Sequence, residues 1–322
     1  MENTTLTAVH KKKRRISRSR VRESLELYVL MLIPLGLLFF MCYMPMPGLA
    51  IAFQDYQLGD SFISSTSHWV GFKHFENFIN GRLFGRLMGN TLRISIKSLL
   101  ITFPIPIAFA LLLNEIKHIK TKKIVQTISY LPHFISTIIV AGMVRGFLDR
   151  NTGLINQIVE LFGGKRQNFI AQKSAFDTIY ICVTVWISFG FESILYMSAI
   201  SGVDQELYEA ARLDGATRWQ QCWHITLPGI LPTVSICLIM ALGGILGANT
   251  DLIMNLYHSG TAKVSEIIGT YVYRMGLGID NAGVLPQYSA TGAISIFSSV
   301  INITMLFIAN KISNWLTGTG LW

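Results

Sequence analysis

Few side chains in this sequence have the types and spacing that enzyme chemistry requires. Asp214 and Gly215 could open a metal-dependent phosphotransfer motif, but that chemistry needs more aspartates along the next helix, and none lies between Trp219 and Thr250. No Gly-x4-Gly-Lys-Ser/Thr loop is present to bind a nucleotide. The histidines show no His-x3-His spacing and the four cysteines no Cys-x2-Cys spacing, so we expect no metal site. A membrane-embedded phosphotransferase is therefore a weak alternative, and we do not expect an enzyme.

A second group of polar residues interrupts long apolar runs. Polar groups in hydrocarbon are costly, so they are candidates for a substrate pathway. For the carboxylate among them, lining a pathway and a structural ion pair both remain open, and the last three could instead mark the outer end of a span. The candidates are Glu192, Trp186, Tyr196, Asn249, Asp251 and Asn255. Gly243 and Gly247 are spaced for close helix packing against a second subunit.

The composition predicts that these residues are carried by membrane helices. Hydrophobic residues make up 51% of the chain and charged residues 14%, and the mean hydropathy is +0.45. A span of roughly 30 Å of hydrocarbon needs about 20 helical residues. Six runs are long enough, which predicts an all-α integral membrane protein with six transmembrane helices. They lie near 27–53, 91–113, 124–148, 177–200, 232–256 and 288–310. Pro104 and Pro106 should bend the second run.

The distribution of basic residues predicts the orientation of the spans. Lysine and arginine number fifteen in segments on one side and ten on the other, and the excess side carries both termini. Basic loops favour the cytoplasm, so we expect both termini to be cytoplasmic. Residues 1–25 are predicted to form a basic cytoplasmic tail and residues 26–322 one transmembrane domain. The basic run next to a span favours anionic lipid over nucleic acid as its partner.

The polar loop 204–231, between the fourth and fifth runs, has strong helix-end signals. Asp204 is a good N-cap, and Gly215 is well placed to end the helix that follows. Thr217 and Gln220 have the spacing of a capping box, which predicts a second short helix. Pro228 suits the first turn of the next span.

The same loop resembles the cytoplasmic loop by which permease subunits of bacterial ABC importers dock onto their ATPase. The resemblance is carried by Glu209-Ala210-Ala211, then Gly215, and then Ile225, Leu227 and Pro228 in order. Tyr130-Leu131-Pro132, Gly202-Val203-Asp204 and Gly320-Leu321-Trp322 also look like permeases for oligosaccharides and polysaccharides, including alginate and other uronate polymers. The resemblance implies these ATPase-contact residues: Glu209, Ala210, Ala211, Asp214, Gly215, Ile225, Leu227 and Pro228.

The resemblance also implies the partners and the location. The expected assembly contains a second homologous permease subunit, an ABC ATPase dimer that binds ATP and Mg²⁺, and an extracytoplasmic solute-binding protein. This chain itself would hold no cofactor and would be a multi-pass protein of the bacterial cytoplasmic (inner) membrane, importing a saccharide, including an acidic one such as alginate. A secondary transporter is the other alternative, but the sequence shows neither inverted repeats nor an ionisable relay.

Overall fold

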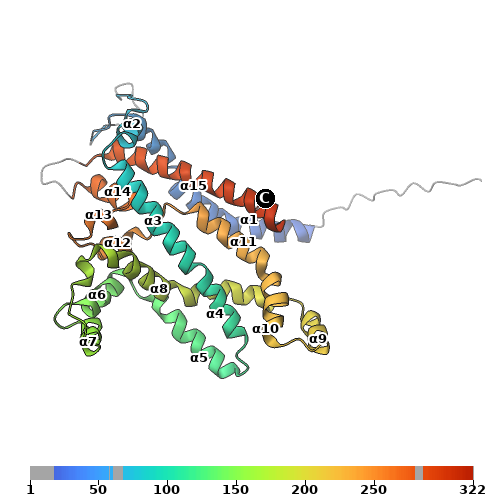
Figure 1. Ribbon diagram of the computed structural model, residues 1–322. Helices are drawn as coiled ribbons and strands as arrows, with labels where there is room; N and C mark the ends of the chain where they lie inside the picture. Colours follow the sequence, from blue (N-terminus) through green and yellow to red (C-terminus); the bar gives the residue numbers. More distant parts are fainter. Residues whose placement is uncertain (1–17, 58, 61–67, 280–285, 322) are drawn as a thin grey trace, which may run out of the picture. The chain divides into compact units, whose positions relative to one another are not determined.

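The computed structural model describes residues 18–57, 59–60, 68–279 and 286–321 (Figure 1). Nearly all of the described chain is helical, and its only β-type pairing is one antiparallel bridge between Gln54 and Trp69. The predicted all-α fold class is therefore confirmed. The chain divides into two compact units, residues 1–50 with 59–67, and residues 51–58 with 68–322.

The first unit contains one long apolar helical stretch. Helix α1 (Arg18–Leu38) is followed by a π-helical turn (Phe39–Tyr43) and a 3-10 helix (Met46–Phe53) that runs into the second unit. Residues 25–53 are long and apolar enough to cross a membrane, as predicted for the first span. Because α1 begins at Arg18, helical structure starts inside the segment predicted as a tail. Residues 1–17 of that segment lie outside the described residues.

The second unit contains the other named helices. They are α2 (Lys73–Ile79), α3 (Phe84–Thr102), α4 (Pro104–Asn114), α5 (Ile119–Tyr130), α6 (Thr137–Leu148), α7 (Leu154–Leu161), α8 (Lys173–Ser201), α9 (Gln205–Leu213), α10 (Arg218–Gln221), α11 (Leu227–Gly243), α12 (Thr250–Asn255), α13 (Ala262–Ser265), α14 (Ile268–Leu277) and α15 (Tyr288–Thr317). Short 3-10 helices occupy Leu131–Phe134 and Phe169–Ala171, and a π-helical turn occupies Cys222–Thr226.

Five helices of the described chain can span a membrane, and a sixth span is present if one bent pair is counted. The second span is continuous from Phe84 to Asn114, with α3 ending at Thr102 and α4 beginning at Pro104, where the sequence predicts a proline bend. The third span was predicted as one helix, but α5 with its 3-10 extension meets α6 at 98°. Pro132 lacks the N–H that would continue the α5 ladder, and the backbone is extended at Ile135.

The predicted fifth span, 232–256, is also wrong at its outer end. Helix α11 ends at Gly243, and the chain takes an irregular course before α12 begins at Thr250. Gly243, Gly244 and Gly247 give this stretch low helix propensity, so the helix ends at the glycines instead of passing through them.

Two buried clusters hold the second unit together. One joins α3, α6, α8 and α12 through Ile94, Val140, Tyr180 and Leu252. The other joins α4, α8 and α11 to the 204–231 segment through Ala110, Ile200, Tyr208 and Ile230. Helix α8 also approaches α5 closely, because a Cβ atom added at Gly190 would collide with the backbone of Ser129.

Charged residues of α3 are neutralised by neighbouring elements. The Asp177 carboxylate on α8 lies 3.3 Å from Arg93 and 2.8 Å from Lys97. Nearer the start of α3, Arg86 lies 2.6 Å from Glu266, which also pairs with Arg274 of α14. These pairs explain how a helix with three cations lies among apolar spans, because each charge has a partner inside the chain.

Candidate functional site

The first helix of the 204–231 segment is capped at both ends as the sequence predicts. The Asp204 carboxylate accepts a hydrogen bond of 3.0 Å from the N–H of Glu206 at the start of α9. At the other end, Ala216 N–H donates to Ala211 C=O at 2.8 Å and Gly215 N–H donates to Arg212 C=O at 3.1 Å. These two bonds form a Schellman motif. Gly215 has φ +77°, which an L-residue adopts only with strain.

The second short helix begins with the predicted capping box. The Gln220 side-chain oxygen accepts from the Thr217 N–H at 2.8 Å, and the Thr217 hydroxyl accepts from the Gln220 N–H at 3.4 Å. Trp219 and Trp223 project from the same side of α10 and the following turn, with ring centroids 5.6 Å apart in an edge-to-face arrangement. Both helix starts are thus fixed by local hydrogen bonds before any partner is present.

The inward side of the segment is anchored to the membrane helices. The Tyr208 ring is buried, and its hydroxyl lies 2.9 Å from the Thr226 hydroxyl. Ile225 and Leu227 pack against the same buried cluster, and Pro228 stands in the first turn of α11. Helix α9 is therefore joined to α8 and α11 through this shared cluster.

The outward side combines polar and apolar groups. Glu209, Ala210 and Asp214 are exposed, and Ala211 is half-buried. Leu213 is 90% exposed and Trp219 67% exposed, which is unusual for large apolar side chains in a polar segment. The predicted contact residues thus separate into an outward group and an inward group that includes Ile225 and Leu227. Leu213 was not predicted, although an apolar residue next to the helix-ending Asp214-Gly215 pair was a usable signal.

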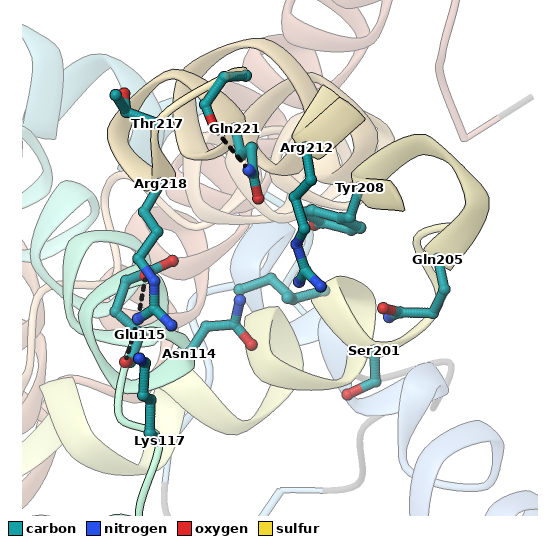
Figure 2. Close-up of a pocket in the computed structure, with 12 residues that line it drawn as sticks. Asn114, Glu115, Lys117, Ser201, Gln205, Tyr208, Arg212, Thr217, Arg218 and Gln221 are labelled. Atoms are coloured by element: carbon teal, nitrogen blue, oxygen red, sulfur yellow. Dashed lines mark hydrogen bonds and ion pairs between the residues drawn. The ribbon is translucent and has the colours of Figure 1, made fainter. Parts of the chain in front are cut away.

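A polar cavity of about 760 Å³ lies between this segment and the end of α4 (Figure 2). Arg218 crosses it, donating to the backbone oxygen of Glu115 at 3.2 Å and to its carboxylate at 3.3 Å. Figure 2 shows Arg212 extending from α9 toward the same space. The other polar residues that line it include Asn114, Lys117, Gln205, Thr217 and Gln221. The Arg218–Glu115 contact was not predicted, because it joins residues far apart in the sequence.

The pathway candidates of α8 occupy two different places. Glu192 and Tyr196 line a cavity of about 620 Å³ with Phe103 of the second span and Cys237 of α11. The Glu192 side chain is exposed on this chain and bonds to Ser188 one turn earlier, while the Tyr196 ring is buried. No salt bridge involves Glu192 among the described residues, so the ion-pair alternative gains no support within the described chain. Trp186 lies instead in an apolar groove between α8 and the α3–α4 span.

The polar residues after α11 have local roles that the sequence did not reveal. Asn249 caps α12, its side chain accepting from the Leu252 N–H at 2.9 Å, and the Asn255 amide donates to the Asp251 backbone oxygen at 2.8 Å. Because α11 ends at Gly243, these residues do not extend its face.

The spacing argument for Gly243 and Gly247 fails for the same reason. Gly247 lies beyond the helix, and a Cβ atom at Gly243 would meet Leu306 of α15. Gly243 therefore packs within this chain. The glycine stretch instead borders a small chamber of about 210 Å³ that hydroxyl groups line, and Asn249 is part of its wall. The hydroxyl groups belong to Ser95, Ser98, Thr102, Tyr180 and Thr184. The Ser95 hydroxyl is buried and has no hydrogen-bond partner in the described structure. Sequence analysis missed this chamber, because its members come from α3 and α8 as well as from the break after α11.

The described part of the chain shows no metal-binding cluster and no disulfide. It contains no group of three or more histidine, cysteine, aspartate or glutamate residues that could hold a metal ion. Cys42, Cys182, Cys222 and Cys237 are all free thiols in the described structure.

The fold and the exposed, doubly capped segment define a membrane-embedded helical subunit with a surface for a partner. Residues 103–317 match the family described as binding-protein-dependent transport system inner membrane component. The chain belongs to this family, so the resemblance to importer permeases is confirmed.

Relatives cover almost the whole chain. It is 37% identical over 317 residues to the polygalacturonan/rhamnogalacturonan transport system permease protein YteP of Bacillus subtilis (strain 168), covering 98% of this chain and 96% of that protein. It is 38% identical over 295 residues to Protein LplB of the same strain, covering 91% of this chain and 90% of LplB.

Two chains in solved structures are also similar to this chain over nearly its whole length. A chain in the crystal structure of a bacterial ABC transporter involved in the import of the acidic polysaccharide alginate has a TM-score of 0.81 and 38% identity, covering 93% of this chain and 98% of that one. A chain of the bacterial alginate ABC transporter in complex with an alginate pentasaccharide-bound periplasmic protein has a TM-score of 0.82 and 38% identity, covering 94% and 99%.

Proposed function

We propose that this chain is the permease subunit of an ABC importer for an oligosaccharide or polysaccharide, with acidic glycans as the leading class. The observation that carries the proposal is the similarity along nearly the full chain to permeases whose names specify polygalacturonan/rhamnogalacturonan transport and alginate import. The hydroxyl-lined chamber beside α11 supports a saccharide, because hydroxyl groups exchange hydrogen bonds readily with sugars.

The exposed 204–231 segment is the basis for the partners that we propose. This chain presents one exposed 204–231 segment, so it fills one half of a two-fold ATPase dimer, and a second permease subunit fills the other. ATP and Mg²⁺ bind to the ATPase, and this chain carries no cofactor. A solute-binding protein delivers the glycan, as the complex of the alginate transporter with its periplasmic protein suggests.

The proposed contact surface for the ATPase consists of the outward residues of the segment. Glu209 offers a carboxylate, Ala210 allows close backbone approach, and Leu213 and Trp219 offer apolar surface. Gly215 fixes the end of α9, while Ile225, Leu227 and Pro228 carry movement into α11. This arrangement requires the segment and both termini to be cytoplasmic.

Reconstitution tests the substrate class directly. The complex of this chain with its second permease, ATPase and binding protein would be placed in vesicles, and ATPase activity measured with uronate oligosaccharides, neutral oligosaccharides, amino acids and peptides. We expect stimulation by uronate oligosaccharides above that by neutral ones. Stimulation only by amino acids or peptides would overturn the saccharide assignment. Stimulation by neutral glycans alone would overturn the acidic class.

A further inference from the structure

Helix α7 has its polar and apolar sides reversed relative to a helix on a water-exposed surface. Asn156 is fully buried, and its side-chain amide donates to the backbone oxygens of Asp149 at 2.9 Å and Gln167 at 3.0 Å. Its side-chain oxygen accepts from the Gln167 N–H at 2.9 Å. A polar residue therefore fixes α7 to the protein from the inside.

The opposite side of α7 is an outward apolar stripe. Leu154, Ile158, Leu161 and Phe162 follow one another at the spacing of one helix face, and all four are exposed. Leu161 is 82% exposed and Phe162 84% exposed. Single exposed apolar residues are common, but a stripe of four with a polar residue buried behind it indicates an apolar environment outside the helix.

Helix α6, which packs against α7, has an exposed apolar face of its own. Ile139, Met143 and Phe147 follow one another at i, i+4 and i+8, and all three are exposed. Because α6 meets α5 at 98°, it does not continue along the axis of α5. The two packed helices therefore both present exposed apolar side chains, in the stretch of chain between α5 and span α8. We call the exposed apolar side chains of α6 and α7 the α6–α7 surface.

Three cations without carboxylate partners among the described residues flank α7 along the chain. Arg150 precedes α7, Lys165 follows it, and Lys173 begins α8; all three side chains are exposed, and no salt bridge of the described residues includes them. Arg166 differs, because it pairs with Glu160 at 2.6 Å. Three unpaired cations next to an apolar surface match an anionic phospholipid, which offers acyl chains and a phosphate together.

We propose that the α6–α7 surface lies in the outer leaflet of the bilayer, with anionic phospholipid head groups held by Arg150, Lys165 and Lys173. Helix α7 ends at Leu161 and span α8 begins at Lys173, so α7 belongs to the connection through which the chain enters this span. A solute-binding protein explains these exposed apolar residues less well than lipid does. A soluble partner binds only transiently, and Leu161 and Phe162 would be exposed to water whenever it dissociates. The proposal rests on membrane insertion and is independent of the transported substrate.

Spin-label accessibility tests the location. Cys42, Cys182, Cys222 and Cys237 would be replaced by alanine, and a nitroxide attached at Phe162→Cys or, as the matched control on the same helix, at exposed Gln157→Cys. The full complex would be placed in vesicles of equal parts phosphatidylcholine and phosphatidylglycerol. We expect the label at 162 to collide more with oxygen than with a water-soluble nickel chelate, and the label at 157 to show the reverse.

Two results would overturn the proposal. One is ready access of nickel to position 162 in vesicles. The other is nickel access that disappears only when the solute-binding protein is added, which would identify the surface as a docking site for that protein. Greater access of oxygen than of nickel at position 162, measured without the binding protein, supports the lipid location.

The head-group contacts are tested separately by lipid retention. Native mass spectrometry would compare phosphatidylglycerol bound to the complex before and after Arg150→Gln, Lys165→Gln and Lys173→Gln. Each lost charge should weaken retention by about fivefold at low ionic strength. Arg166→Gln is the matched control, since Arg166 is already paired, and it should change retention little. Equal loss in the control, or no loss in the three variants, would contradict the assignment of the cations.

Discussion

Glu209 is one of two carboxylates, with Asp214, among the exposed contact residues that the sequence predicts, and it lies on a helix that is capped at both ends. Glu209→Ala removes a partner for a donor on the ATPase without disturbing the buried side of α9. We expect a membrane-inserted complex with most of its uptake and substrate-stimulated ATPase activity lost. Glu206→Gln, at an exposed position of the same helix, is the control and should retain both activities. Unimpaired uptake in Glu209→Ala would remove this residue from the contact surface.

Gly215 is the residue at which backbone conformation matters most. A Cβ atom there would meet no atom within 4 Å, so the cost of Gly215→Ala comes from φ +77° alone. That cost is about 1–2 kcal/mol for an L-residue. We expect weaker coupling in Gly215→Ala, measured as substrate-stimulated ATPase activity, and a smaller loss in Gly215→Asn, because asparagine tolerates the left-handed conformation better. Unimpaired, wild-type activity in both variants would show that this turn is not critical.

At the scale of elements, the Arg218–Glu115 contact joins the 204–231 segment to the end of α4. The side chains are 56% and 39% exposed, so the pair contributes at most about 1 kcal/mol to stability. Its expected role is to position the segment. Arg218→Glu should lower coupled ATPase activity through repulsion from Glu115, and the double swap with Glu115→Arg should restore part of it. No recovery in the double variant would mean that Arg218 acts through another group.

The connection between α6 and α7 depends on Asp149. Hydrogen bonds from the backbone and side chain of Thr152, and from the backbone of Asn151, lower the pKa of its carboxyl below the ordinary value of 3.8. A depressed pKa means that the stabilisation is present above the unfolded-state value and is lost as the pH falls through the folded-state value. We expect hydrogen exchange at the Thr152 amide, corrected for its intrinsic rate, to accelerate as the pH is lowered below the ordinary value of 3.8. Asp149→Ala should exchange rapidly both above and below that pH; slow exchange in that variant would contradict this role.

Sequence signals predicted the elements well where the signal is local. The Asp204 cap, the turn at Gly215 and the capping box at Thr217 each depend on residues within a few positions, so they could be read from spacing. The glycines that end α11 at Gly243 and the proline before the 98° bend at α6 are also local, although they were not read correctly from the sequence. The contact of Gly243 with Leu306 and the chamber lined by Ser95 depend on packing among separate segments, so they could not be read from spacing.

At the scale of the whole molecule, composition alone predicted the membrane-embedded, all-helical class, since 14% charged residues are too few for a typical soluble surface. The division of the 204–231 segment into outward and inward sides needed the structure, because Ile225 and Leu227 have the same hydrophobic character as exposed Leu213. The resulting account has ATPase movement enter at Glu209 and Ala210 and reach α8 and α11 through the cluster around Tyr208.

Cross-linking the segment to the ATPase tests this account most directly. In the chain with its four cysteines replaced, Ala210→Cys would carry a short thiol cross-linker in the assembled complex. Exposed Asp251→Cys, which the proposed topology puts on the opposite side of the membrane, is the control. The account predicts a cross-link between this chain and the ATPase from position 210 and none from position 251. It also predicts that ATP changes the yield at position 210. No cross-link at 210 in an intact, active complex, or labelling of that cysteine by a membrane-impermeant reagent added outside cells, would contradict the central claim.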